Sequence, residues 1–155
     1  MKTFINALCV VVTLTAVVSA AAADKPNFSG EWKMSAAKSN FGGLPAPSSI
    51  VRKVTHTEPS LVIVEEQQGD MGTQNTTRKY TTDGQPASFE ANGAQVVGSA
   101  VWEGNVLVVS STVEGIGVKF IDRMSLSEDG RTMTSAVHVA SPQGEIDLSI
   151  VFDKQ

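Results

Sequence analysis

Short runs of β-branched and other apolar residues recur about every ten residues from position 28 onward, and Gly, Pro, Asn or Asp closes most of them. No segment of this part of the chain carries an apolar stripe at helical spacing. The pattern predicts an all-β protein of about ten strands. We expect strands at residues 28–34, 50–57, 61–67, 76–82, 87–91, 95–102, 106–113, 118–127, 132–140 and 145–153.

The connections between these runs are short and contain residues typical of tight turns, such as Asp83-Gly84, Gly104-Asn105 and Asp129-Gly130. Gly and Asn adopt the positive φ that tight hairpins need, and strands joined this closely are antiparallel neighbours. The sequence therefore predicts an antiparallel up-and-down meander of about 8 to 10 strands. Residues 35–49 form one long connection, which we expect to contain a helical turn at 35–38 and to cross one end of the sheet.

Alternation along the strands gives the sheet one apolar face. Ile146, Leu148, Ile150 and Phe152 share one side of the last predicted strand, and residues such as Asp147 lie on the other. A meander with one apolar face leaves exposed edges that invite aggregation unless the sheet closes. We therefore expect the sheet to close into a barrel.

Residues 1–23 have the pattern of a secretory signal peptide. Lys2 precedes an apolar stretch at residues 7–18, and small residues follow before Asp24. The stretch is too short to span a hydrocarbon layer of about 30 Å, although an uncleaved N-terminal anchor is the alternative. We expect cleavage near residue 23, one domain over residues 24–155, a secreted or periplasmic location, and no membrane insertion after cleavage. Cys9, the only cysteine, lies inside the apolar stretch.

The charge of the chain argues against nucleic-acid and membrane-surface partners. There are 12 Lys and Arg residues against 16 Asp and Glu residues, and no basic run occurs. Phosphate backbones and anionic lipids attract clustered positive charge. We therefore expect no nucleic-acid partner, and the sequence predicts no particular oligomeric state.

Three segments resemble a known superfamily. Residues 28–34 read FSGEWKM, residues 100–105 read AVWEGN, and residues 151–155 read VFDKQ. These segments resemble the calycin superfamily of lipocalins and fatty-acid-binding proteins, and the chain as a whole resembles a secreted bacterial lipocalin-like protein. Gly30-x-Trp32 resembles the first-strand motif whose Trp closes the base of the barrel. The resemblance implies a calycin-like β-barrel.

Two departures from the fatty-acid-binding proteins bear on function. Those proteins place two lid helices after the first strand, where this chain has the Gly- and Pro-rich residues 41–47. They also hold the ligand carboxylate with an Arg-x-Tyr pair in the final strand, and the matching positions here are Ile150 and Phe152. The resemblance therefore implies a different cap and the absence of that carboxylate anchor.

Inward residues of medium size leave room for a cavity in a small barrel. We therefore expect the barrel to bind a small apolar or amphipathic molecule without chemistry. The predicted cavity lining is Trp32, Val109, Phe120, Met124, Val137, Leu148 and Ile150, with Trp102 and Phe89 as further candidates. The alternatives are an envelope protein-protein interaction module with a filled core, or a haem-binding barrel or enzyme that uses a histidine.

The sequence contains no pattern of a catalytic or metal site. Neither His56 nor His138 is accompanied by further ligands at metal-binding spacing, and Ser99 lacks the glycines of a nucleophile elbow. We therefore expect no catalytic residue, no metal and no cofactor. His138 alternates with Val137 and Val139, so it is predicted to face outward; the alternative is a bulge that turns it inward as a haem ligand.

Asp122 shares the predicted inward parity of Phe120 and Met124. A buried carboxylate is costly without a cation, so we expect Arg78, Arg123 or Lys119 to pair with it. The alternative is a bulge that turns Asp122 outward. Glu65 and Glu66 are adjacent on a predicted strand and therefore face opposite sides.

Overall fold

The computed structural model describes residues 25–70 and 72–155, which form one antiparallel sheet of ten strands. The strands are β1 (Gly30–Met34), β2 (Ser49–Thr57), β3 (Ser60–Gly69), β4 (Gly72–Thr81), β5 (Ala87–Ala91), β6 (Ala94–Glu103), β7 (Val106–Val113), β8 (Val118–Leu126), β9 (Thr132–Ser141) and β10 (Gly144–Lys154). A short 3-10 helix, η1, spans Ala36–Lys38. The predicted fold class is confirmed. The predicted signal peptide and its cleavage site lie outside the described residues.

Each predicted strand overlaps one observed strand. The largest difference is in β4, which begins at Gly72 instead of the predicted residue 76, because the β3–β4 ladder continues through polar residues to the pair Gly69 and Gly72. Backbone pairing there extends beyond the apolar pattern that marks strands in a sequence. No helix among the residues described is long and apolar enough to cross a membrane.

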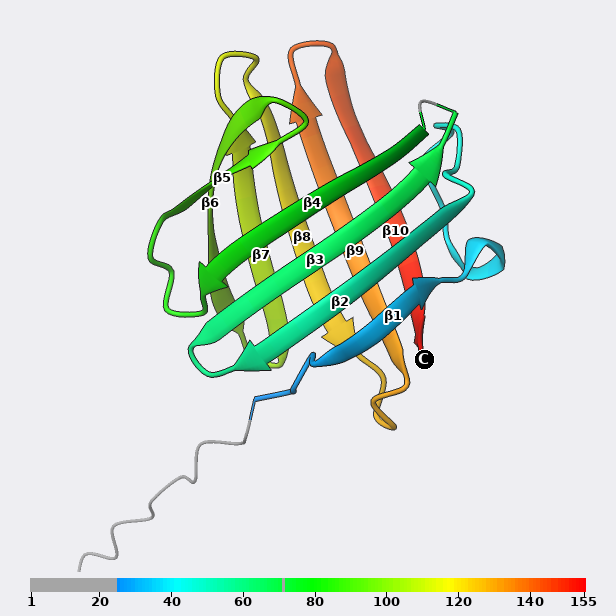
Figure 1. Ribbon diagram of the computed structural model, residues 1–155, viewed down its shortest axis with the longest axis vertical. Coiled ribbons are helices and arrows are strands. Elements are labelled where there is room, and N and C mark those ends of the chain that lie inside the picture. Colours follow the sequence, from blue (N-terminus) through cyan, green and yellow to red (C-terminus); the bar gives the residue numbers. More distant parts are fainter. Residues whose placement is uncertain (1–24, 71) are drawn as a thin grey trace, which may run out of the picture.

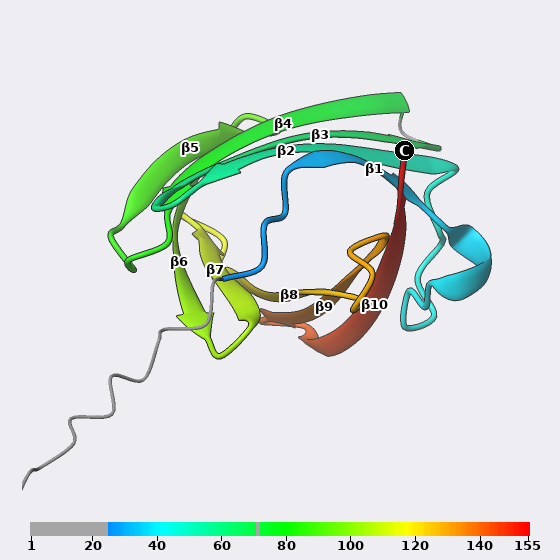
Figure 2. The same cartoon turned by 90° about the horizontal axis from the view of Figure 1, so that it is seen from below.

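The sheet curls into a nearly closed barrel (Figures 1 and 2). Strand order is β4-β3-β2-β1-β10-β9-β8-β7-β6-β5, so the first and last strands pair and the barrel closes through β1 and β10. β4 and β5 are the two ends of this order and are not joined by a backbone ladder. Side chains bridge them: Asn92 Nδ2 donates to Gln74 Oε1 at 3.3 Å, and the rings of Tyr80 and Phe89 meet edge to face.

The long connection from β1 to β2 contains the predicted helical turn as η1 and then follows β10. The backbone of Asn40 pairs with that of Ser149, and further along Ser48 N donates to Gln68 O at 2.8 Å. The chain thus passes from β10 to the tip of the β3–β4 hairpin at one end of the barrel, as predicted. We refer to residues 41–48 as the mouth loop.

The opposite end of the barrel is filled by large side chains, and we refer to it as the packed end. The segment before β1 crosses this end (Figure 2), and Phe28 and Trp32 are fully buried there. Trp32 Nε1 donates to Phe28 O at 2.9 Å, so the indole is held in place as well as buried. Further fully buried side chains of the core are Leu61, Ile63, Leu107, Met124, Met133 and Phe152. Burying each such side chain stabilises the fold by roughly 1.5–3 kcal/mol.

Candidate functional site

A cavity of about 500 Å³ occupies the half of the barrel toward the mouth loop. Much of its wall is apolar and comes from β5 to β10. Uncharged polar side chains also contribute to the wall, among them Gln67, Gln74, Thr76, Asn92 and Ser111. The barrel is therefore filled at one end and hollow toward the other, which lies between the two outcomes expected for a small barrel.

The predicted lining residues divide between the two halves. Val109, Phe120, Val137, Leu148 and Ile150 lie on the cavity wall, as does Phe89. Their contact with a ligand stays a prediction.

Trp32 and Met124 share the inward face and are fully buried at the packed end, and neither is among the residues that line the cavity. Trp102 also lies at that end, where its ring is 6.0 Å from that of Phe28. Alternation assigns a residue to the inner face, but it does not say how far along the barrel axis the residue lies. For this reason the sequence pattern placed residues of both halves in one predicted cavity.

The floor of the cavity is a group of charged side chains between the hollow and packed halves. Glu65 Oε2 lies 2.7 Å from Arg52 Nε and 3.1 Å from Arg78 Nη2, so one carboxylate oxygen accepts from both guanidinium groups. Arg52 also lies over the ring of Phe152, with 4.6 Å from Cζ to the ring centroid. A cation above an aromatic face gains electrostatic attraction.

Asp122 is buried and inward, as its parity predicted. Its Oδ2 lies 3.7 Å from Arg52 Nη1, and Ser135 Oγ donates to its Oδ1. The predicted partners were wrong: Arg78 pairs with Glu65, Arg123 faces outward and pairs with Glu103, and Lys119 is exposed. The partner is on β2, across the barrel from β8, and the sequence pattern does not show which strands face each other across the lumen.

The ion pairs set the protonation of this group. Burial by itself would raise the pKa of Glu65, but the charges of Arg52 and Arg78 and the hydrogen bond from Arg52 outweigh it and lower that pKa. Burial also acts to lower the pKa of Arg52, and the carboxylates of Glu65 and Asp122 raise it overall. Glu65 and Arg52 are therefore both charged at neutral pH.

Arg78 is the less fully paired of the two arginines. Its Nη2 donates to Glu65, whereas its Nε is buried without a hydrogen-bond partner among the described residues. Buried polar groups in native proteins are nearly always hydrogen-bonded. The β4 side of the floor therefore retains hydrogen-bonding capacity.

Arg52 and Glu65 were not predicted to form a site, and Arg78 was predicted only as a partner of Asp122. A signal was present, because Arg52 alternates with Ile50, Val54 and His56, all of which are buried. A charged residue in an inward series of this kind marks a buried ionic group.

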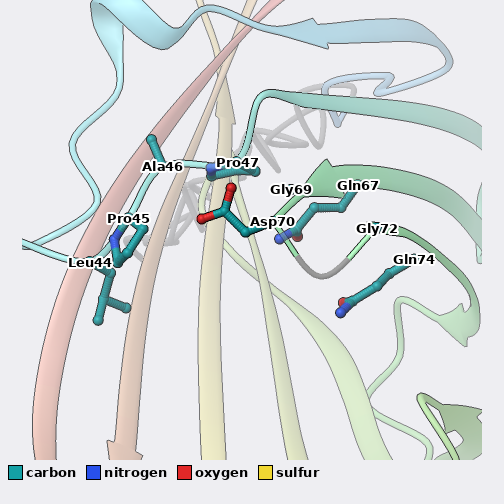
Figure 3. Close-up of a pocket in the computed structure, with 9 residues that line it drawn as sticks. All are labelled: Leu44, Pro45, Ala46, Pro47, Gln67, Gly69, Asp70, Gly72 and Gln74. Carbon is teal, nitrogen blue, oxygen red and sulfur yellow. The ribbon is translucent and has the colours of Figure 1, made fainter.

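A second hollow, about 320 Å³ in volume, lies between the mouth loop and the β3–β4 hairpin (Figure 3). Leu44, Pro45 and Pro47 form one side. Gln67 and Gln74, which are paired across β3 and β4, line both this hollow and the cavity. The two spaces therefore share a wall at the open end of the barrel.

The histidines lie apart from the cavity. His138 faces outward, as predicted, and its Nδ1 is 2.8 Å from Asp147 Oδ1. His56 is buried at the packed end, where its Nδ1 accepts from Phe28 N at 3.3 Å and its Nε2 lies 3.0 Å from Glu58 Oε1. Nε2 therefore carries the proton and donates to Glu58. No group of three or more potential metal ligands occurs in the described part of the chain.

Glu58 gathers donors from several elements at the packed end. Its carboxylate accepts from Thr82 Oγ1, from His56, and from Trp102 Nε1 at 2.7 Å. Burial would raise the pKa of Glu58, but these hydrogen bonds outweigh it and lower that pKa. The cluster fastens the β2–β3 turn to β6 and gives His56 and Trp102 structural roles.

No protein-family model and no curated protein matches this sequence. Solved structures match over most of the chain. Zebrafish ileal bile acid-binding protein complexed with cholic acid is 15% identical with a TM-score of 0.62, and the match covers 83% of this chain and 98% of that one. A secretory abundant heat soluble protein from Ramazzottius varieornatus is 10% identical with a TM-score of 0.65, covering 84% and 98%.

Fatty-acid-binding protein 1 of Echinococcus granulosus is 15% identical with a TM-score of 0.57, and the match covers 82% of this chain and 96% of that one. These matches cover most of the part of the chain that the structure describes. The chain therefore has a ten-stranded, calycin-like antiparallel β-barrel fold, similar to the folds of these structures.

Proposed function

We propose that this protein binds a small apolar or amphipathic molecule inside the barrel and releases it unchanged. The observation that carries the proposal is the division of the barrel into a packed end and a cavity of about 500 Å³. Apolar surface buried in such a cavity supplies affinity at about 25 cal/mol per Å², and a few polar groups orient the ligand. Val109, Phe120, Val137, Leu148 and Ile150 provide the apolar contacts.

The structural neighbours support this proposal. One is a bile acid-binding protein in complex with cholic acid, and another is named a fatty-acid-binding protein. Both are named for binding, which supports a binding role without catalysis for the present barrel. Because these identities are low, the chemical class of the ligand has to be inferred from the residues that line the cavity of this chain.

The proposed location is outside the cytoplasm, after cleavage near residue 23. The basic residue, apolar stretch and small residues of residues 1–23 support it. Expression of the full chain in a bacterial host, followed by periplasmic fractionation and N-terminal sequencing, tests this proposal. We expect a periplasmic product that begins near Asp24; an uncleaved cytoplasmic product would contradict it.

Binding is tested with the uncharged, solvatochromic dye Nile red. We expect saturable fluorescence enhancement by the wild-type protein. Val137→Trp should abolish it by filling the cavity, whereas Val64→Trp, which adds the same ring at an exposed position on β3, should preserve it. Equal binding by both variants would place the dye elsewhere. Native mass spectrometry of the purified protein should also reveal a copurifying small molecule.

A further inference from the structure

Glu65 lies between two guanidinium groups at the floor of the cavity. It faces the cavity from β3 and accepts hydrogen bonds from Arg52 on β2 and Arg78 on β4. Two neighbouring guanidinium groups are a strong binding site for one carboxylate, because each N–H bond is charge-assisted. In this barrel the protein's own side chain occupies that site.

The charges on the cavity wall are balanced without a ligand. The charged residues that line the cavity are Arg52, Arg78, Glu65 and Asp122, two of each sign. Arg52 lies between both carboxylates, and Ser135 provides a further hydrogen bond to Asp122. No charged residue among the described lining is left as an unshared cation for an anionic ligand.

A carboxylate that entered the cavity would therefore be an excess negative charge. It would lose its hydration while lying near Glu65 and Asp122, and like charges in a buried site disfavour the ionised form. The overall charge of −4 adds no attraction for an anion. An uncharged ligand avoids both costs.

The floor nevertheless has hydrogen-bonding capacity for an uncharged oxygen. Arg78 lines the cavity and uses only Nη2 toward Glu65, and the amide side chains of Gln67 and Gln74 lie on the same wall. An alcohol, ketone or ester oxygen accepts hydrogen bonds without bringing net charge. Its apolar body would face the Val, Leu, Ile and Phe side chains of β7 to β10.

On the basis of the proposed binding function, we infer that the cavity selects an uncharged amphiphile with an acceptor oxygen and rejects carboxylates, because Glu65 already fills the site between Arg52 and Arg78. The selectivity arises from the side chain of Glu65 on β3. It is a property of this chain's own cavity and differs from a carboxylate anchor.

The test compares cis-parinaric acid with its methyl ester, two fluorescent probes that share one polyene chain and differ in charge. At pH 7.5 and below micellar concentrations, we expect the wild-type protein to bind the ester at least about tenfold more tightly, which corresponds to about 1.4 kcal/mol. Equal or tighter binding of the acid overturns the inference. This comparison needs no variant, so it stands even where a substitution impairs folding.

Glu65→Gln removes the internal carboxylate and leaves both arginines. We expect its ester-to-acid preference to fall by at least about tenfold, with the change arising mainly from tighter binding of the acid. Glu66→Gln, at the exposed neighbouring position, is the matched control and should keep the wild-type preference. An unchanged preference in a folded Glu65→Gln variant overturns the inference.

The outcomes separate this inference from the proposed function. Failure of Nile red, the ester and the acid to bind would refute ligand binding as a whole. Binding of Nile red and of both parinaric probes without preference for the ester would leave ligand binding intact and refute the selectivity.

Discussion

Arg52 on β2 reaches across the lumen to Asp122 on β8, with 3.7 Å between Nη1 and Oδ2. The two residues are 70 positions apart in the sequence and belong to opposite walls of the barrel. Their contact, together with the Arg52–Glu65 pair, places an ionic layer between the packed end and the cavity. Arg52 therefore both joins opposite walls of the barrel and forms part of the floor of the cavity.

Arg52→Met should strongly destabilise the protein. The substitution leaves Asp122 without its cation and Glu65 with only Arg78, and breaking a buried ion pair from one side costs about 3–5 kcal/mol. Lys53→Met is the control on the same strand, because the exposed Lys53 pairs with Glu31 at the surface and should contribute at most about 1 kcal/mol. Urea denaturation at pH 7 measures both, and equal losses would contradict the central role of Arg52.

The free energy of unfolding should decrease in acid, partly because Glu65 becomes protonated. Because folding holds the pKa of Glu65 below its ordinary value of 4.5, the unfolded chain takes up the proton first as the pH falls. This contribution is complete above about pH 4.5 and is lost as the pH drops through the lower folded-state value. Urea midpoints measured from about pH 6 to pH 3 should therefore change less in Glu65→Gln than in wild type.

Glu66→Gln removes a carboxylate from the outer face of the same strand and serves as the control for this measurement. It should retain the wild-type pH profile. Glu58, whose pKa is also lowered, contributes in the same direction in all three proteins. A Glu65→Gln profile parallel to that of wild type would show that the arginines do not stabilise the ionised form of Glu65.

Gly98→Ala should destabilise the barrel even though Gly98 lies within a regular strand. A Cβ at this position would come within 2.5 Å of Ser110 O and 3.2 Å of Tyr80 Cε1. Such crowding in a packed wall typically costs about 1–3 kcal/mol. Ser99→Ala, on the opposite face of β6, should change stability by at most about 0.5 kcal/mol in the same urea assay, and a neutral Gly98→Ala would refute the close approach.

Most of the fold could be predicted from the sequence because strand periodicity and turn chemistry are local. The parity of Phe120, Asp122 and Met124 correctly assigned the inner face of β8. Trp32 and Met124 show what parity lacks, since they share the inner face with Val109 and yet do not line the cavity as Val109 does. Position along the barrel axis depends on strand tilt and register, which arise from pairing between strands.

The ionic floor shows a second limit. Asp122 was recognised as a buried acid in need of a cation, but the predicted partners were near in sequence or chosen by charge alone. The actual partner, Arg52, becomes a neighbour only when the barrel closes. Contacts across a lumen join strands that are not paired, so neither turn residues nor alternation can indicate them.

A reversible cross-link should show whether ligands pass between the mouth loop and the β3–β4 hairpin. A Cβ at position 69 would lie 4.0 Å from Pro47 Cα, close enough for a disulfide between Pro47→Cys and Gly69→Cys. The only natural cysteine, Cys9, precedes the barrel, so a variant that begins at residue 24 has no competing thiol. Gln67 and Gln74 line the spaces on both sides, so a path between these two segments would lead to the cavity.

We expect the oxidised double variant to take up Nile red at least about tenfold more slowly than the reduced form in stopped-flow measurements, because opening of the two segments becomes restricted. Equilibrium affinity should change far less, since the cavity wall itself is unaltered. Reduction should restore the rate, and each single-cysteine variant should behave like wild type under both conditions. Equal rates in the oxidised and reduced forms would show that ligands enter by another route. The next place to cross-link would be between β4 and β5, which are not joined by backbone hydrogen bonds.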